Sequence, residues 1–158
     1  YYNNQLITTI DPVELRREVV MLSQVPAIFE GNIRDNLLIG LRFSDKHDVG
    51  DDVLRQALEM VHLPKALDDK ADTLSGGEKQ RLVFARVILM DAKAYLIDEP
   101  TSALDENTEQ AVMDSFVDFV RDRGKTVVMV THSRVVAEQY SDHIFYMESI
   151  NQSEGAVQ

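Results

Sequence analysis

The chain has 158 residues, enough to bury one hydrophobic core, and 44% of them are hydrophobic, so we expect one globular domain. Its formal net charge of −11 argues against a nucleic-acid partner, because contact with phosphates requires a basic face. The absence of cysteine excludes disulfides and thiolate metal sites, and no apolar run reaches the roughly 20 residues of a membrane span.

The first half of the chain predicts one strand and then a mostly helical section. Residues 18–22, with the sequence EVVML, read as a strand that ends before Gln24 and Pro26, since proline lacks a hydrogen-bond donor. The next predicted segments are a short helix at 32–39, a polar loop at 42–51 and a helix at 52–62, the last from its apolar periodicity. We therefore expect residues 27–80 to be mostly helical.

The second half alternates between strands and helices. Strands are predicted at 94–97, 127–130 and 144–147, and helices follow Ser75, span about 107–122 and separate the last two strands. This alternation is typical of a parallel sheet flanked by helices, which places the chain in the α/β class. We expect the α/β parts to cover residues 1–26 and 81–148, with a tail at 149–158.

The sequence LSGGEKQR covers residues 74–81 and predicts a helix N-terminus. Ser75 and Glu78 have the spacing of a capping box, which by itself indicates only a well-capped helix. Gly76 and Gly77 favour a further role, because two glycines leave the first backbone N–H groups of the helix bare. Such N–H groups carry partial positive charge and bind anions such as phosphate.

The sequence DEPTSALD covers residues 98–105 and follows the apolar strand at 94–97. Asp98 and Glu99 therefore lie at the carboxyl end of a parallel strand, the edge at which α/β proteins bind ligands. A carboxylate there suits Mg²⁺, and a second one suits general-base catalysis. A solvated strand end is the alternative for an isolated acidic pair.

These motifs, taken in chain order, resemble the ATP-binding cassette (ABC) superfamily over about residues 14–147. LSGGEKQR resembles the family's signature motif, with Glu78 where glutamine is common. The resemblance implies that the signature residues bind the γ-phosphate of ATP, that Asp98 holds Mg²⁺, and that Glu99 is the general base. The signature residues are Ser75, Gly76, Gly77 and Glu78.

Three further positions match the family. Asp105 resembles the D-loop aspartate, which passes across a dimer interface near the nucleotide. His132 resembles the switch histidine, which reaches the γ-phosphate. Gln24 resembles the Q-loop glutamine, which senses Mg²⁺ and water and couples to a membrane partner. His47, His62 and His143 have no partner motif and are predicted to be surface residues.

The sequence lacks the P-loop pattern G-x-x-x-x-G-K-[ST] between a strand and a helix. Gly124, Lys125 and Thr126 match its end, but Phe119 occupies the position of the first glycine and a strand follows. Gly124 instead fits the residue that ends the preceding helix. In the family the P-loop lies upstream of the Q-loop, so we expect a nucleotide-binding domain without its N-terminal third, in a chain that begins at Tyr1.

The length of the signature helix predicts a two-fold dimer. Residues 76–90 as a helix would span about 22 Å, which sets Ser75 far from Asp98 of the same chain. Ser75 would then serve a nucleotide held by a second subunit, while Asp98, Glu99 and His132 serve their own. The resemblance implies the family's ATP sandwich, formed here by a homodimer.

The resemblance implies a function, with two alternatives. The expected function is the ATP-binding and ATP-hydrolysing subunit of an ABC transporter, with ATP and Mg²⁺ as cofactors. A transmembrane permease would be its partner, at the cytoplasmic face of the cell membrane. The alternatives are a soluble ABC-type ATPase of repair or translation, and an inert truncated fragment.

Overall fold

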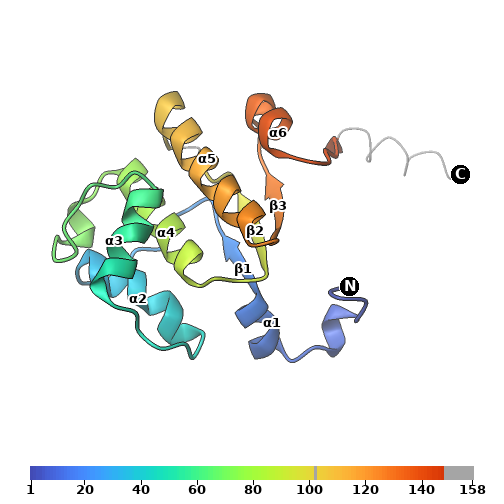
Figure 1. Ribbon diagram of the computed structural model, residues 1–158, viewed down its shortest axis with the longest axis horizontal. Helices are drawn as coiled ribbons and strands as arrows, with labels where there is room; N and C mark the ends of the chain where they lie inside the picture. The colour runs from blue at the N-terminus through green and yellow to red at the C-terminus, as the bar shows by residue number, and fades with distance from the viewer. Residues whose placement is uncertain (102, 148–158) are drawn as a thin grey trace, which may run out of the picture.

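A three-stranded parallel sheet organises the chain, as Figure 1 shows. The computed structural model describes residues 1–101 and 103–147. Its strands are β1 (Val19–Leu22), β2 (Ala94–Asp98) and β3 (Thr126–Val130), in the spatial order β1-β2-β3. In the register of the sheet, Val20 pairs with Tyr95, and Tyr95 pairs with Val127. The predicted parallel α/β arrangement is confirmed.

The described residues form six α-helices, and one face of the sheet stays uncovered. They are α1 (Pro12–Glu18), α2 (Ile33–Phe43), α3 (Asp51–Met60), α4 (Gly76–Leu89), α5 (Glu106–Asp122) and α6 (Arg134–Tyr140), with short 3-10 turns at Ile7–Thr9 and Ala71–Thr73. The sequence reading missed α1, although Asp11 accepts hydrogen bonds from the first helical N–H groups and Pro12 fits the first turn. Helix α2 continues to Phe43, into the segment predicted as a loop.

Side-chain caps fix where the helices begin. Asn32 and Asp35 form a capping box at the start of α2, and Ser133 accepts a hydrogen bond from the N–H of Val136 at the start of α6. Gly124 follows the end of α5 with a φ of +59°, a conformation that glycine adopts without a steric penalty. Its predicted role as a helix-ending residue is confirmed.

The hydrophobic core lies between one face of the sheet and helices α4 and α5. Val20 and Ile97 are buried on that face, and Tyr95 meets Phe116 of α5 with ring centroids 5.6 Å apart. Phe84 of α4 also contacts Phe116, at 4.8 Å between centroids. Apolar residues of α2 and α3 belong to the same continuous core. The helical section and the sheet are therefore packed together.

A buried arginine joins α4 to α2 and to the segment before α2. The guanidinium of Arg86 donates hydrogen bonds to the carbonyl of Asn36 at 2.6 Å, to its Oδ1 at 2.9 Å and to the carbonyl of Ala27 at 2.8 Å. The same group lies 5.1 Å from the ring centroid of Phe29. Burial lowers the pKa of Arg86 to about 10, so it remains charged at neutral pH.

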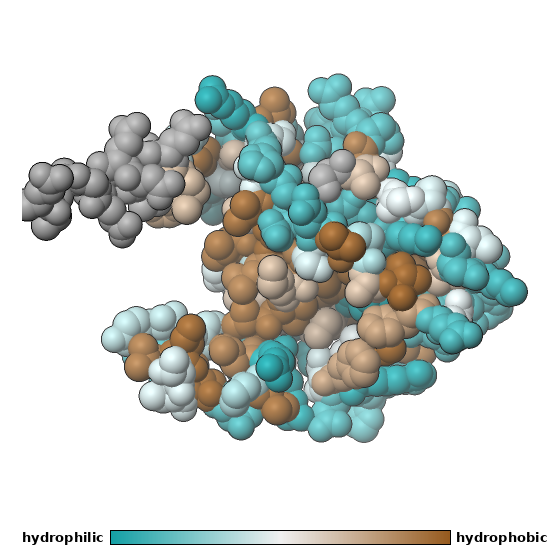
Figure 2. All heavy atoms as spheres, turned by 180° about the vertical axis from the view of Figure 1, so that it is seen from behind, coloured by the Kyte–Doolittle hydropathy of each residue, from teal (hydrophilic) through white to brown (hydrophobic). Residues whose placement is uncertain are grey.

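The other face of the sheet carries exposed apolar side chains. Met21, Leu96 and Val128 occupy one row across the three strands, and their exposed fractions are 59%, 39% and 57%. Figure 2 shows apolar residues gathered in a hollow on the side away from α5. Parallel sheets are normally covered by helices on both faces. This face is not covered by the described residues.

The predicted strand at 144–147 is wrong. Residues 144–146 are irregular, and within the described part of the chain no strand pairs with the outer edge of β3. A strand needs a neighbour to satisfy its backbone groups, and this segment has none; Phe145 is 81% exposed. The predicted tail at 149–158 and residue 148 lie outside the described residues. The predicted subdomain boundaries at 27–80 stay a prediction.

Candidate functional site

The carboxyl edge of the sheet brings together residues from all three strands. Leu22 pairs with Ile97 and Asp98 pairs with Val130, so the segments after the strands begin side by side. The structure places Gln24, Asp98, Glu99 and His132 at this edge. Gln24 is exposed in the loop after β1, so its amide is accessible to a ligand.

Glu99 and His132 face each other at this edge. The Oε1 atom of Glu99 lies 3.7 Å from the Nε2 atom of His132. The Glu99 side chain is 13% exposed, whereas the His132 side chain is 95% exposed. A mostly buried carboxylate beside an accessible imidazole can accept a proton from a water molecule that lies between the carboxylate and a ligand.

The backbone of Glu99 adopts an unusual conformation. Its φ is +49°, in the left-handed region that residues with a side chain rarely occupy. Its N–H donates a hydrogen bond to the carbonyl of Val130 at 3.0 Å, which ties the turn after β2 to the last residue of β3. This turn directs the chain away from the sheet directly after Asp98.

Asp98 lies at the carboxyl edge of the sheet, where the sequence predicts a metal ligand. It is half-buried as the last residue of β2. In residues 1–101 and 103–147, no group of three or more histidine, aspartate or glutamate side chains is arranged to hold a metal by itself. A single carboxylate with the amide of Gln24 nearby fits Mg²⁺, which takes one or two protein oxygens and completes its shell with phosphate and water.

The capping box predicted at Ser75 is present. The Oγ atom of Ser75 accepts a hydrogen bond from the N–H of Glu78 at 3.3 Å, and the N–H of Ser75 donates to Oε2 of Glu78 at 2.8 Å. Helix α4 extends over 14 residues from this point. Its exposed N-terminus therefore carries the partial positive charge that attracts anions.

The two glycines of the motif have different surroundings. A Cβ atom on Gly76 would meet nothing within 4 Å, so the space beside it is open. A Cβ atom on Gly77 would lie 2.9 Å from the carbonyl oxygen of Ala103, which is closer than real contacts allow. Gly77 is thus required for the approach of the loop after β2, whereas Gly76 leaves room for another molecule.

Glu78 has a local structural role. Besides the capping box, its Oε1 atom pairs with Nζ of Lys65 at 2.9 Å. The hydrogen bond from Lys65, followed by those from Ser75, lowers the pKa of Glu78 to about 2. Its predicted contact with a nucleotide stays a prediction.

The segment after Asp98 contacts the first turns of helix α4. Gln80, in the second turn of α4, donates a hydrogen bond to the carbonyl of Glu99 at 3.1 Å. The chain turns back after β2, so the loop that follows Asp98 lies against the first turns of α4. The distance between Ser75 and Asp98 stays a prediction, and so does the assignment of Ser75 to a second subunit.

Asp105 caps helix α5. Its Oδ1 atom accepts a hydrogen bond from the N–H of Thr108 at 3.1 Å, and its Oδ2 atom accepts one from the hydroxyl of Thr108 at 2.7 Å. These bonds lower the pKa of Asp105, with the hydroxyl contact as the largest cause. The side chain is exposed, which leaves the predicted position beside a second subunit open to test.

The sequence reading missed two buried polar residues of α4, Gln80 and Arg86. The signal was present, because Gln80 and Phe84 are four residues apart and share the helix face that the core covers. A polar residue at a core position of a helix needs hydrogen-bond partners in the fold. For Gln80 these partners belong to the segment that carries Glu99.

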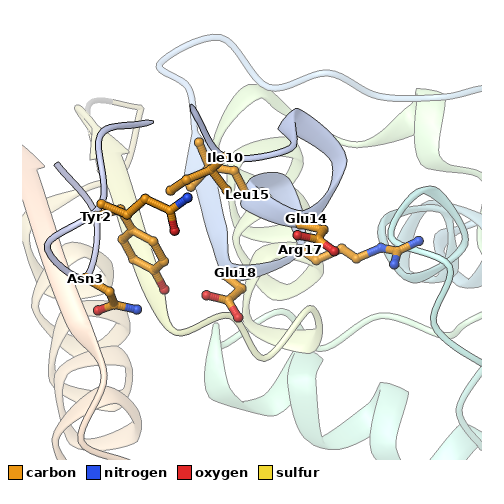
Figure 3. Close-up of a pocket in the computed structure, with 8 residues that line it drawn as sticks. Tyr2, Asn3, Ile10, Glu14, Leu15, Arg17 and Glu18 are labelled. Carbon is orange, nitrogen blue, oxygen red and sulfur yellow. The ribbon is translucent and has the colours of Figure 1, made fainter. Parts of the chain in front are cut away.

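A separate pocket of about 410 Å³ lies near the amino end of β1, and Figure 3 shows its lining. In that view Tyr2 and Glu18 point toward each other across it. Its residues are Tyr2, Asn3, Gln5, Ile10, Glu14, Leu15, Arg17 and Glu18. The amino end of a parallel strand is opposite the edge that carries Asp98, so this pocket is not part of the candidate site.

Comparison with known proteins decides the family. Residues 1–102 match the family model described as "ABC transporter". The chain belongs to the ABC transporter family. It is 38% identical over 136 residues to the "Phosphate import ATP-binding protein PstB 3" of Natronomonas pharaonis, which covers 84% of this chain and 49% of that protein.

Two further relatives of this ABC chain have informative names. It is 35% identical over 154 residues to the "Mycobactin import ATP-binding/permease protein IrtB" of Mycolicibacterium thermoresistibile, across 90% of this chain and 25% of that protein. A dimeric ATP-binding cassette, solved in a post-hydrolysis state with ADP and Pi, shares the fold at a TM-score of 0.75 and 27% identity, over 87% of this chain and 63% of that one.

The ABC chain spans only part of these proteins, between 11% and 49% of the length of the curated relatives that it matches. Among its described residues, no helix is both long and apolar enough to cross a membrane.

Proposed function

We propose that this chain is the catalytic part of an ATP-hydrolysing subunit that powers an ABC transporter. The observation that carries the proposal is the pairing of Glu99 with His132 at 3.7 Å, beside Asp98 at the carboxyl edge of the sheet. Relatives named as ATP-binding import proteins support it.

In the proposed reaction, a water molecule attacks the γ-phosphorus of ATP. Glu99 accepts a proton from that water, the bond to the β-phosphate oxygen breaks, and ADP and phosphate are the products. His132 is accessible enough to donate a hydrogen bond to the γ-phosphate. Mg²⁺, when bound, would neutralise phosphate charge; Asp98 would hold it, and Gln24 would contact it or its water.

We further propose that two copies of the subunit share each nucleotide. Ser75 and Gly76 are exposed at the N-terminus of α4, and a Cβ atom on Gly76 would meet nothing of its own chain. The neighbour solved with ADP and Pi is a dimer, which supports the same arrangement here. Ser75, Gly76 and Gly77 would then bind the γ-phosphate of the partner's nucleotide, and Asp105 would lie at the interface.

The phosphate-binding loop belongs, in this proposal, to a segment that completes the sheet. Within the described residues the outer edge of β3 has no neighbouring strand, and Met21, Leu96 and Val128 lack cover. A strand beside β3 followed by a helix over that row would satisfy both requirements. We call the protein in which this chain is joined to its phosphate-binding loop the intact subunit.

A transmembrane permease is the proposed partner at the membrane. The name of IrtB combines an ATP-binding protein with a permease, which supports such a pairing. The subunit would lie at the cytoplasmic face as a peripheral protein. Its net charge of −11 disfavours the nucleic-acid partner expected of a repair ATPase.

Phosphate release and co-purification test the proposal. The intact subunit should release phosphate from ATP only with Mg²⁺ present, and it should co-purify with an integral membrane protein. Co-purification with nucleic acid would indicate the soluble ABC-type ATPase instead. A folded intact subunit without Mg²⁺-dependent hydrolysis would contradict the proposal.

A further inference from the structure

Gln80 is a buried amide with both of its polar groups engaged. Its exposed fraction is 3%, in the second turn of α4. Its Nε2 atom donates to the carbonyl of Glu99 at 3.1 Å, and its Oε1 atom accepts from the N–H of Ala103 at 3.0 Å. A buried amide is costly unless its groups are hydrogen-bonded, so the Gln80 side chain and the backbone groups of Glu99 and Ala103 fix each other.

The loop after β2 contains the strained backbone of the proposed base. Glu99 has a φ of +49°, and such a conformation persists only where the surroundings hold it. Its N–H is bonded to the carbonyl of Val130, and its carbonyl is bonded to Gln80. Gln80 therefore holds one of the two backbone groups that determine where the Glu99 side chain projects.

The same loop also rests on the first turn of α4. The carbonyl of Ala103 approaches Gly77 so closely that a Cβ atom there would lie 2.9 Å away. The N-terminus of α4, with Ser75 and Gly76, is the surface assigned to the partner's nucleotide, whereas the loop carries the base for the chain's own nucleotide. Gln80 contacts the loop from within α4 and so joins the two.

We propose that Gln80 is a positioning residue, which fixes the backbone of Glu99 and of Ala103 against α4 and thereby aligns the general base with the attacking water. The inference rests on the ATPase function proposed above. In this proposal Gln80 does not contact the nucleotide. It acts through its hydrogen bond to the backbone of Glu99. The contact also links the phosphate-binding helix terminus of one site to the base of the other.

The first test replaces the amide by an apolar side chain of similar length. In the intact subunit, Gln80→Met should lower kcat by about 10²-fold, the effect of a small misplacement of a reacting group, while the KM for ATP changes little. Val87→Ala is the matched control, because Val87 is a buried residue of the same helix with an exposed fraction of 4%. It should lower the melting temperature and leave kcat close to that of wild type.

The second test uses pH to switch the hydrogen bond to Glu99. In Gln80→Glu, an ionised carboxylate accepts from the N–H of Ala103 but has no proton for the carbonyl of Glu99. A protonated carboxyl has the shape of the amide and can donate, and burial raises the pKa of such a group. The ratio of the kcat of Gln80→Glu to that of wild type should therefore rise as the pH falls from about 8 to about 5.5.

The corresponding ratio for Gln80→Met should stay constant with pH, because methionine carries no titratable group. An unchanged kcat in Gln80→Met, or a ratio for Gln80→Glu that is independent of pH, overturns the role of Gln80. If Gln80→Met does not fold, the pH dependence of Gln80→Glu decides. An inactive wild type would instead contradict the ATPase function itself.

Discussion

The Nε2 atom of His132 lies 3.7 Å from the Oε1 atom of Glu99, although the two residues follow different strands of the sheet. Parallel pairing of β2 with β3 produces this proximity, because Asp98 and Val130 are partners and each functional residue lies just beyond them. The exposed imidazole extends toward solvent, where a phosphate would arrive, and the carboxylate lies behind it. The sheet register thus brings together the proposed general base and the candidate histidine.

We expect the 158-residue chain alone to bind ATP–Mg²⁺ weakly. The sequence contains no P-loop, so the backbone cradle and the lysine that bind the β- and γ-phosphates are missing from these residues. Isothermal titration calorimetry measures this directly. A dissociation constant in the low micromolar range would show that the described edge of the sheet binds nucleotide without a P-loop.

The two glycines of the signature should respond differently to alanine. Gly77→Ala places a Cβ atom 2.9 Å from the carbonyl oxygen of Ala103, so the free energy of unfolding should fall by about 1–3 kcal/mol. Gly76→Ala is the matched control, because open space surrounds that position, and its effect should stay within about 0.5 kcal/mol. Urea unfolding of both variants checks this, and equal losses would refute the packing argument.

The Glu78–Lys65 pair should make the free energy of unfolding depend on pH in the acidic range. The pKa of Glu78 is about 2, below its ordinary value of 4.5, so the ionised form stabilises the fold. This contribution is present above pH about 4.5 and is lost as the pH falls through about 2. Glu78→Gln keeps a hydrogen-bond acceptor for Ser75 and loses the charge. It should be less stable than wild type at pH 7, and the difference should shrink toward pH 2.

Local signals in the sequence were sufficient for much of the fold. Ser75 and Glu78 predicted the start of α4, because a capping box depends only on neighbouring residues. The apolar run before Asp98 predicted β2 and its carboxyl end, because that pattern is also local. The strand at 144–147 failed because a strand depends on a distant partner, and its own residues do not encode that partner.

For the candidate site, the sequence motifs indicated which residues matter but not every contact between them. Family motifs indicated Glu99 and His132, and strand register places them together. The contact of Gln80 with Glu99 depends on how the chain turns back after β2, which the φ of +49° at Glu99 permits. No local sequence pattern predicts that turn, so the contact between Gln80 and Glu99 was not predicted from the sequence.

Mixed dimers test whether Ser75 serves a second subunit. In the intact subunit, Ser75→Arg places bulk and charge where the partner's γ-phosphate docks, so each mutant alone should lack hydrolysis. When Ser75→Arg subunits are paired with Glu99→Gln subunits, one composite site carries both changes and the other carries neither. Purified heterodimer should therefore regain hydrolysis that neither homodimer shows. If Ser75 served its own chain's nucleotide, each site would carry one lesion and no activity would return.

The turnover of Glu99→Gln in the intact subunit tests the central claim most directly. The amide keeps the size of the carboxylate and loses its basicity, so ATP binding should persist while hydrolysis falls by about 10²–10⁴-fold. Single-turnover phosphate release and nucleotide binding should be measured on the same preparation. Retained ATP binding with hydrolysis reduced by that factor is the predicted result; unchanged turnover would show that Glu99 is not the base.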